Sequence, residues 1–152
     1  MEVEPGYVPA LNYLSLTYYQ QNLTRHQEQL TRQAVELMEK AVTLSERDPT
    51  RLEDLGFLLA KVGRTNDAQA ILTELESADK QKYVSKVDFA VLVAALGQKD
   101  RALALLEEAL KRKEGQLVQM KVDPLYDDLR GDPQFQEVLS RVGLGDKVSS
   151  GR

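Results

Sequence analysis

Apolar residues return at steps of three and four positions through most of this chain. The segment 52–62 shows the spacing clearly, because Leu52, Leu55, Leu59 and Val62 share one face if the segment is helical. This spacing is typical of an amphipathic helix and differs from the alternation of a strand. The pattern predicts helices over 8–21, 31–46, 50–62, 66–78, 86–96 and 99–113.

The same pattern recurs at an interval of 34 residues. When the chain is shifted by this interval, apolar residues meet apolar residues and small residues meet small ones. The matched pairs are Leu55 with Phe89, Gly56 with Ala90, Leu59 with Val93, Val62 with Leu96, Gly63 with Gly97, Ala68 with Ala102, Ile71 with Leu105 and Leu72 with Leu106. Such an interval is typical of stacked helix-turn-helix units.

An earlier and less regular copy precedes these two. Its second half fits directly, because Ala34 lies 34 residues before Ala68. Its first half fits only when seven extra residues are allowed, and the excess falls within QNLTRHQEQLT at 21–31. We therefore expect the first hairpin to have either a longer connection or a helix extended by extra turns.

Cap and turn residues stand at the predicted helix ends. Asp48 followed by Pro49 is typical of a helix start, because proline fits the first turn and aspartate accepts from its free N–H groups. Ser85, with an acidic residue three positions later, resembles a capping box. Gly63 and Gly97 stand where a left-handed residue would end a first helix. Small residues at close helix crossings are predicted at Ala41, Gly56, Ala68, Ala90, Ala102 and Ala109.

With this repeat and these small residues, the chain resembles the tetratricopeptide repeat (TPR) family, in particular the C-terminal end of a bacterial array. The segment PTRLEDLGFLLAKVGRTNDAQAILTELE carries the likeness best, although Leu52 and Leu75 depart from the family pattern. The resemblance implies an all-α fold, a right-handed superhelix of about three helix-turn-helix hairpins with a C-terminal capping helix. We expect one domain over 1–144, with units at 8–46, 49–80 and 83–114, a cap at 116–143 and a flexible tail at 145–152.

The cap has helix-start signals of its own. Asp123–Pro124 and Asp132–Pro133 both have the pattern of an N-cap followed by a first-turn proline. Phe135, Val138, Leu139 and Val142 then form an apolar face. We expect this segment to cover the apolar end of the third hairpin, because a terminal repeat otherwise exposes the face that a further repeat would bury.

In TPR arrays the first helix of each unit lines a concave groove that holds a partner. The resemblance therefore implies a non-catalytic protein–protein interaction module that binds a peptide or helix of a partner protein. The matching groove positions are Asn12, Leu16, Tyr19, Glu53, Phe57, Ala60, Lys61, Val87, Val91 and Ala94. Leu16, Asp54 and Val84 disfavour the carboxylate clamp of chaperone-binding members. The alternative is a structural or homo-oligomeric element whose own chain covers these side chains.

Composition and charge exclude several other classes. A formal net charge of −4 over 152 residues disfavours nucleic-acid binding and RNA-reading repeats, because phosphate binding requires a basic surface. The absence of cysteine excludes disulfides and thiolate metal sites. No segment approaches the ~20 apolar residues that span a bilayer. We expect a soluble protein without membrane insertion, and a cytoplasmic location is favoured.

Catalytic and metal-binding patterns are missing from the sequence. His26 is the only histidine, and the aspartates of the C-terminal segment lack the spacing of a calcium loop. Glu107 and Glu108 are adjacent on a predicted helix and diverge by about 100°, so they cannot face one substrate together. We expect them to pair instead with Lys111 and Arg112. The sequence predicts no enzyme activity, no metal and no cofactor, and an enzyme with an unfamiliar site is the remaining alternative.

Overall fold

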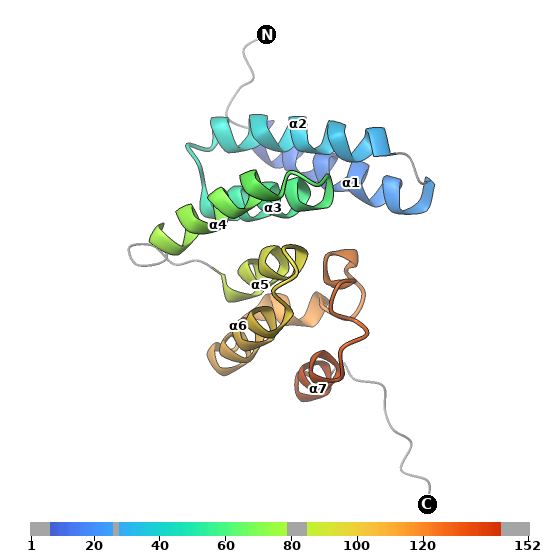
Figure 1. Ribbon diagram of the computed structural model, residues 1–152, viewed down its shortest axis with the longest axis vertical. Helices are drawn as coiled ribbons and strands as arrows, with labels where there is room; N and C mark the ends of the chain where they lie inside the picture. Colours follow the sequence, from blue (N-terminus) through green and yellow to red (C-terminus); the bar gives the residue numbers. More distant parts are fainter. Residues whose placement is uncertain (1–6, 26–27, 79–84, 144–152) are drawn as a thin grey trace, which may run out of the picture. The chain divides into compact units, whose positions relative to one another are not determined.

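The computed structural model describes residues 7–25, 28–78 and 85–143, and all regular structure within them is helical (Figure 1). The α-helices are α1 (Val8–Arg25), α2 (Glu28–Leu44), α3 (Pro49–Lys61), α4 (Thr65–Ala78), α5 (Lys86–Ala95), α6 (Lys99–Arg112) and α7 (Pro133–Arg141). Two 3₁₀ turns, η2 (Gly115–Gln119) and η3 (Pro124–Tyr126), separate α6 from α7. The predicted all-α fold is confirmed, and every predicted helix ends within four residues of its expected bounds.

The chain divides into two compact units. The first unit, Met1–Val84, contains α1 to α4, and the second unit, Ser85–Arg152, contains α5 to α7. In the first unit α1 packs against α2, α2 against α3, and α3 against α4. In the second unit α6 packs against both α5 and α7. Helices therefore pair along the chain as the 34-residue pattern predicts, while the superhelix and the single domain over 1–144 stay predictions.

The first hairpin absorbs its extra residues by extending both helices. The helix α1 continues to Arg25, and α2 already begins at Glu28. The two helices cross closely at Ser15, whose Oγ donates a hydrogen bond of 2.6 Å to the carbonyl oxygen of Ala34. Both residues are fully buried. A small side chain at this point lets the helix backbones approach, and the hydrogen bond satisfies the buried hydroxyl.

The ends of α3 and α5 have the same hydrogen bonds, 34 residues apart. Gly63 has a φ of 82° and Gly97 a φ of 81°. The N–H of each donates to the carbonyl three residues earlier, at 3.2 and 2.9 Å. The next N–H reaches five residues back, from Arg64 to Leu59 at 2.9 Å and from Gln98 to Val93 at 3.1 Å. Each helix thus ends in a Schellman motif that needs a left-handed residue.

The helix starts also follow the predicted cap residues. The Asp48 carboxylate accepts from the N–H groups of Thr50 and Arg51, and Ser85 Oγ accepts from the N–H of Asp88. Asp132 caps α7 by accepting from the N–H of Gln134 at 2.8 Å. The expected start at Asp123 is present too, but it opens the three-residue 3₁₀ turn η3 and not an α-helix.

An arginine organises the segment between α6 and α7. The Arg130 guanidinium donates to the carbonyl oxygens of Met120 at 3.3 Å, of Lys121, and of Asp123 at 2.5 Å. Its Nε also donates to Asp127 at 2.7 Å. These bonds satisfy carbonyl groups that a regular helix would otherwise pair internally. The segment therefore holds a defined path without forming an α-helix.

The small residues predicted at close helix crossings lie in the core. Ala41, Ala68, Ala90, Ala102 and Ala109 are all 0% exposed, as expected at close helix crossings. In the C-terminal segment, the buried side chains are Leu117, Met120, Tyr126, Leu129, Phe135, Val138 and Leu139. Among the described helices, none combines the length and the apolar character needed to cross a bilayer.

Candidate functional site

The predicted groove positions of the first unit are more enclosed than an open groove would be. On α1, Asn12 and Leu16 are half-buried and Tyr19 is buried. On α3, Glu53 and Phe57 are buried, Ala60 is half-buried and Lys61 is exposed.

Phe57 shows why. Its ring packs edge-on against Tyr19, with centroids 5.2 Å apart and planes at 86°, and the side chain is 1% exposed. The ammonium of Lys61 lies 5.4 Å from the centroid of the same ring. Phe57 is therefore a core contact between α1 and α3, and its role in binding a partner stays a prediction.

The groove positions of the second unit are enclosed as well. Val87, Val91 and Ala94 on α5 are at most 5% exposed. The helix α6 packs on α5, and Glu114, two residues after the end of α6, accepts a hydrogen bond of 3.3 Å from the N–H of Val87. The burial agrees with the alternative interpretation, in which the chain itself covers these side chains. Their assignment to a partner-binding groove stays a prediction.

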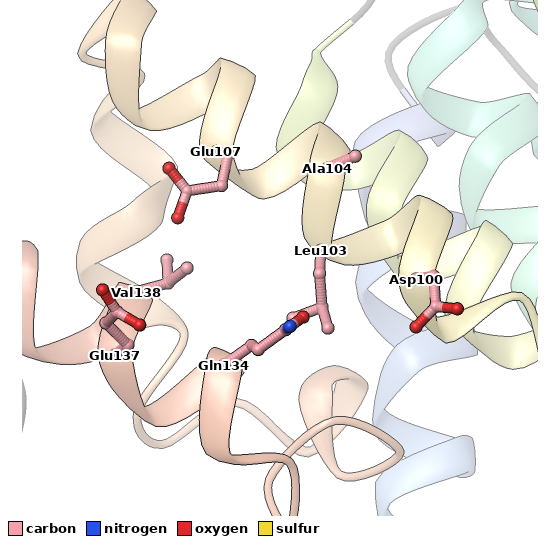
Figure 2. A pocket seen from close by; sticks show the side chains of 7 residues that line it. All are labelled: Asp100, Leu103, Ala104, Glu107, Gln134, Glu137 and Val138. Carbon is pink, nitrogen blue, oxygen red and sulfur yellow. The ribbon is translucent and has the colours of Figure 1, made fainter.

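A different surface is open in the second unit. A cleft of 350 Å³ lies between α6 and α7 (Figure 2). It is lined by Asp100, Leu103, Ala104 and Glu107 from α6 and by Gln134, Glu137 and Val138 from α7. A volume above about 300 Å³ is within the range of protein ligand sites.

The cleft has an apolar base and an acidic rim. Leu103 is 4% and Val138 is 1% exposed, so both are anchored in the core. In the view of Figure 2, the carboxylates of Glu107 and Glu137 lie on one side of the cleft, and Asp100 lies toward the other. The chain forms this arrangement because α6 and α7 each pack an apolar stripe inward and leave acidic neighbours at the edge.

One of these acids is held by an ion pair. Arg141, at the end of α7, donates to both oxygens of Glu107 at 2.7 and 2.6 Å. This pair ties α7 to α6 beside the cleft. Asp100 and Glu137 remain exposed, so the rim keeps an excess of negative charge. The arrangement suits a ligand that combines an apolar group with a positive charge.

Sequence reasoning missed this cleft. It predicted the pairing of Glu108 with Arg112, which the structure confirms at 2.5 Å, because both residues belong to one helix. Glu107 was expected to pair with Lys111 and instead meets Arg141, from a helix whose position the sequence does not specify. The apolar stripe of α7 was the one feature of the sequence that could have indicated the cleft, because Val138 of this stripe lies with Leu103 at the base of the cleft.

The described residues contain no cluster of three His, Asp or Glu side chains that could hold a metal ion. Comparisons with protein-family models, with curated proteins and with solved structures found no match for this chain. Membership of the TPR family therefore stays a prediction that rests on the residues quoted above.

Proposed function

We propose that this protein is a non-catalytic interaction module that binds a peptide segment of a partner protein. The observation that carries the proposal is the cleft between α6 and α7. Its apolar base, Leu103 and Val138, lies under a rim on which acidic residues outnumber the single neighbouring Arg141. The 34-residue pattern of hairpins supports the same conclusion, because such repeats commonly serve as binding scaffolds.

The cleft indicates the chemistry of the peptide. An aliphatic side chain would pack on Ala104, which is exposed beside the nearly buried Leu103 and Val138, and an adjacent lysine or arginine would meet Glu137 or Asp100. The apolar contact contributes affinity through the ligand side chain that it buries at the mouth of the cleft. The charges mainly accelerate association and make it dependent on salt.

Three substitutions that each change the net charge by one unit test this proposal. Ala104→Arg fills the exposed mouth of the cleft, and Glu137→Gln removes one rim charge. Ser140→Lys adds the same charge on the exposed surface of α7 and does not line the cleft. Peptides selected from a displayed random library on the intact protein should lose more than about tenfold in affinity with Ala104→Arg, as at a binding hot spot.

The other two variants separate charge from position. Glu137→Gln should weaken binding by a few-fold at low salt and much less at high salt, because salt screens exposed charges. Ser140→Lys should leave affinity nearly unchanged. Equal binding by all three variants would exclude the cleft. A mass that rises with protein concentration in sedimentation would instead favour the homo-oligomeric alternative.

A further inference from the structure

A second, more polar cleft lies in the first unit, where three helix ends meet. It has a volume of 260 Å³ and lies at the end of α1, the start of α2 and the end of α3. Its lining residues are Asn22, Glu28, Thr31, Arg32, Lys61 and Val62. This cleft shares no residue with the one between α6 and α7.

Two buried oxygens beside this cleft lack hydrogen-bond partners. Thr31 is 4% exposed, and neither its Oγ1 nor the Oδ1 of Asn22 is bonded within the described part of the chain. Thr31 lies in the first turn of α2, where the residue four positions earlier precedes the helix, whereas Thr17, Thr43 and Thr73 donate to carbonyl groups within their own helices. A buried polar group without a hydrogen bond is costly to the fold, so these two oxygens point to a missing partner.

A neighbouring cleft extends this one along α2. It has a volume of 440 Å³, shares Arg32 and Val62 with the first, and adds Val35 and Arg64 among its walls. We call the two clefts together the α2 furrow. The α2 residues that line the furrow extend from Glu28 to Glu39, a length of about 16 Å along the helix. An extended peptide covers this length with about five residues.

The charges along the α2 furrow are balanced. The acidic residues are Glu28, Glu36 and Glu39, and the basic ones are Arg32, Lys61 and Arg64. Arg64 and Glu39 already form an ion pair of 3.1 Å. Across the whole furrow neither sign is in excess, so neither an anion nor a cation is specifically attracted. The balance therefore favours an uncharged ligand with both a donor and an acceptor.

We propose that the α2 furrow binds an extended, uncharged peptide segment of a partner protein. Both oxygens are covered in the unbound protein, so rotation of the two side chains into the cleft lets a peptide N–H donate to Asn22 Oδ1 and a peptide carbonyl accept from Thr31 Oγ1. The next apolar side chain covers Val35 and Val62. Rotation about χ1 exchanges the Thr31 methyl and hydroxyl groups, and helical threonines populate two such rotamers. The inference rests on the proposed peptide-binding function and adds a second contact with a different ligand preference.

Peptides are first selected on the intact protein from a displayed random library. Their affinities for variants of each site then show which peptides bind the α2 furrow and which bind the α6–α7 cleft. Peptides of the α2 furrow should lose about three- to tenfold in affinity with Thr31→Val and with Asn22→Ala, as expected for one lost hydrogen bond. They should keep their affinity with Ala104→Arg, and salt should not change it. Thr43→Val is the matched control, because it makes the same change on the exposed part of α2.

Methylation of single backbone nitrogens in a selected peptide tests the hydrogen bond itself. One position should weaken binding to the natural protein and have no further effect on Asn22→Ala, because the two changes remove the same bond. If Thr31→Val raises the melting temperature and changes the affinity of no selected peptide, the furrow holds only water. That result would overturn the proposal. A library without any peptide sensitive to Thr31→Val would overturn it too. Peptides sensitive only to Thr31→Val would retain the furrow and exclude the α6–α7 cleft.

Discussion

Glu114 shows how one side chain connects two helices of the second unit. Its carboxylate is buried and accepts from Ser85 Oγ at 3.1 Å and from the N–H groups of Lys86 and Val87 at 3.3 Å. These N–H groups lie at the start of α5 and have no partner within the helix. A negative charge at this point is also stabilised by the helix dipole. Glu114, two residues after the end of α6, therefore completes the first turn of α5.

Tyr126 lies in the same buried region and gives a prediction on pH. Burial raises the pKa of its hydroxyl above the ordinary value, and the nearby carboxylates of Asp88, Asp123 and Glu114 raise it further. The folded protein therefore resists ionisation of Tyr126, while the unfolded chain ionises near pH 10. The stability that the un-ionised Tyr126 gives the fold is fully present below about pH 10. It is lost as pH rises toward the folded pKa, by about 1.4 kcal/mol of unfolding free energy per pH unit.

Tyr126→Phe removes this titration. Between about pH 8 and about pH 11, the natural protein should lose about 1.4 kcal/mol more unfolding free energy than the variant. Urea unfolding at each pH measures the difference. Tyr13→Phe, at a ring that is 76% exposed, is the control and should follow the natural protein. Identical pH profiles for Tyr126→Phe and the natural protein would show that the hydroxyl ionises freely in the fold.

The sequence predicts residue roles where both partners are near in the chain. Asp48, Ser85 and Asp132 were recognised as caps because each accepts from N–H groups two or three residues away. The role of Glu114 could not be predicted, since its partners lie 27 to 29 residues earlier. For the same reason, the contact of Phe57 with Tyr19 was missed, and Phe57 was expected on an open surface.

At the scale of helices, the matched ends of α3 and α5 give a second prediction. Gly63→Ala and Gly97→Ala should each lower the unfolding free energy of their unit by about 1–2 kcal/mol, because the backbone stays left-handed and an added Cβ is strained there. No other atom lies within 4 Å of either new Cβ, so the cost is that of the backbone alone. Urea midpoints measure both variants.

Gly131→Ala is the control for these substitutions. A Cβ at Gly131 also meets nothing within 4 Å, but its backbone is not left-handed. Alanine should therefore be neutral or stabilise by up to about 1 kcal/mol, since it restricts the unfolded chain. A loss at Gly131 as large as at Gly63 would show that flexibility, and not the left-handed conformation, explains the effect.

Helices with regular periodicity were predictable, and the segments between them were less so. The extra residues at 21–31 left two possibilities open, and the structure extends both α1 and α2. The path between α6 and α7 depends on Arg130, whose bonds to three carbonyl groups have no signature in the apolar pattern. The sequence therefore located Asp123 as a start but did not distinguish a 3₁₀ turn from an α-helix.

At the scale of the whole molecule, the burial of α5 explains why the groove could not be predicted. A helical pattern identifies which side of a helix is apolar, but it does not identify what covers the other side. In α5 nearly every residue is buried, including Val87 and Val91. The open cleft lies instead between α6 and α7, whose stripes are narrower and leave exposed edges.

The C-terminal segment accounts for much of the core of the second unit, which leads to the last prediction. Ending the chain after Glu114 removes seven side chains that are at most 4% exposed: Leu117, Met120, Tyr126, Leu129, Phe135, Val138 and Leu139. Each contributes about 1.5–3 kcal/mol by burial, so together they contribute about 10–21 kcal/mol, as much as the total stability of an ordinary domain, about 5–15 kcal/mol. The shortened second unit should therefore unfold or associate.

Amide hydrogen exchange followed helix by helix tests this expectation. Protection of α5 and α6 should collapse, while α3 and α4 keep theirs, because the first unit has a core of its own. A chain that ends after Gly143 is the control, since it keeps every one of the seven buried residues. If α5 stayed protected in a monomer that ends at Glu114, the segment would be an appendage to the second unit and not its cap. If α3 lost protection as well, the two units would unfold as one, and the single domain expected over 1–144 would describe the protein better.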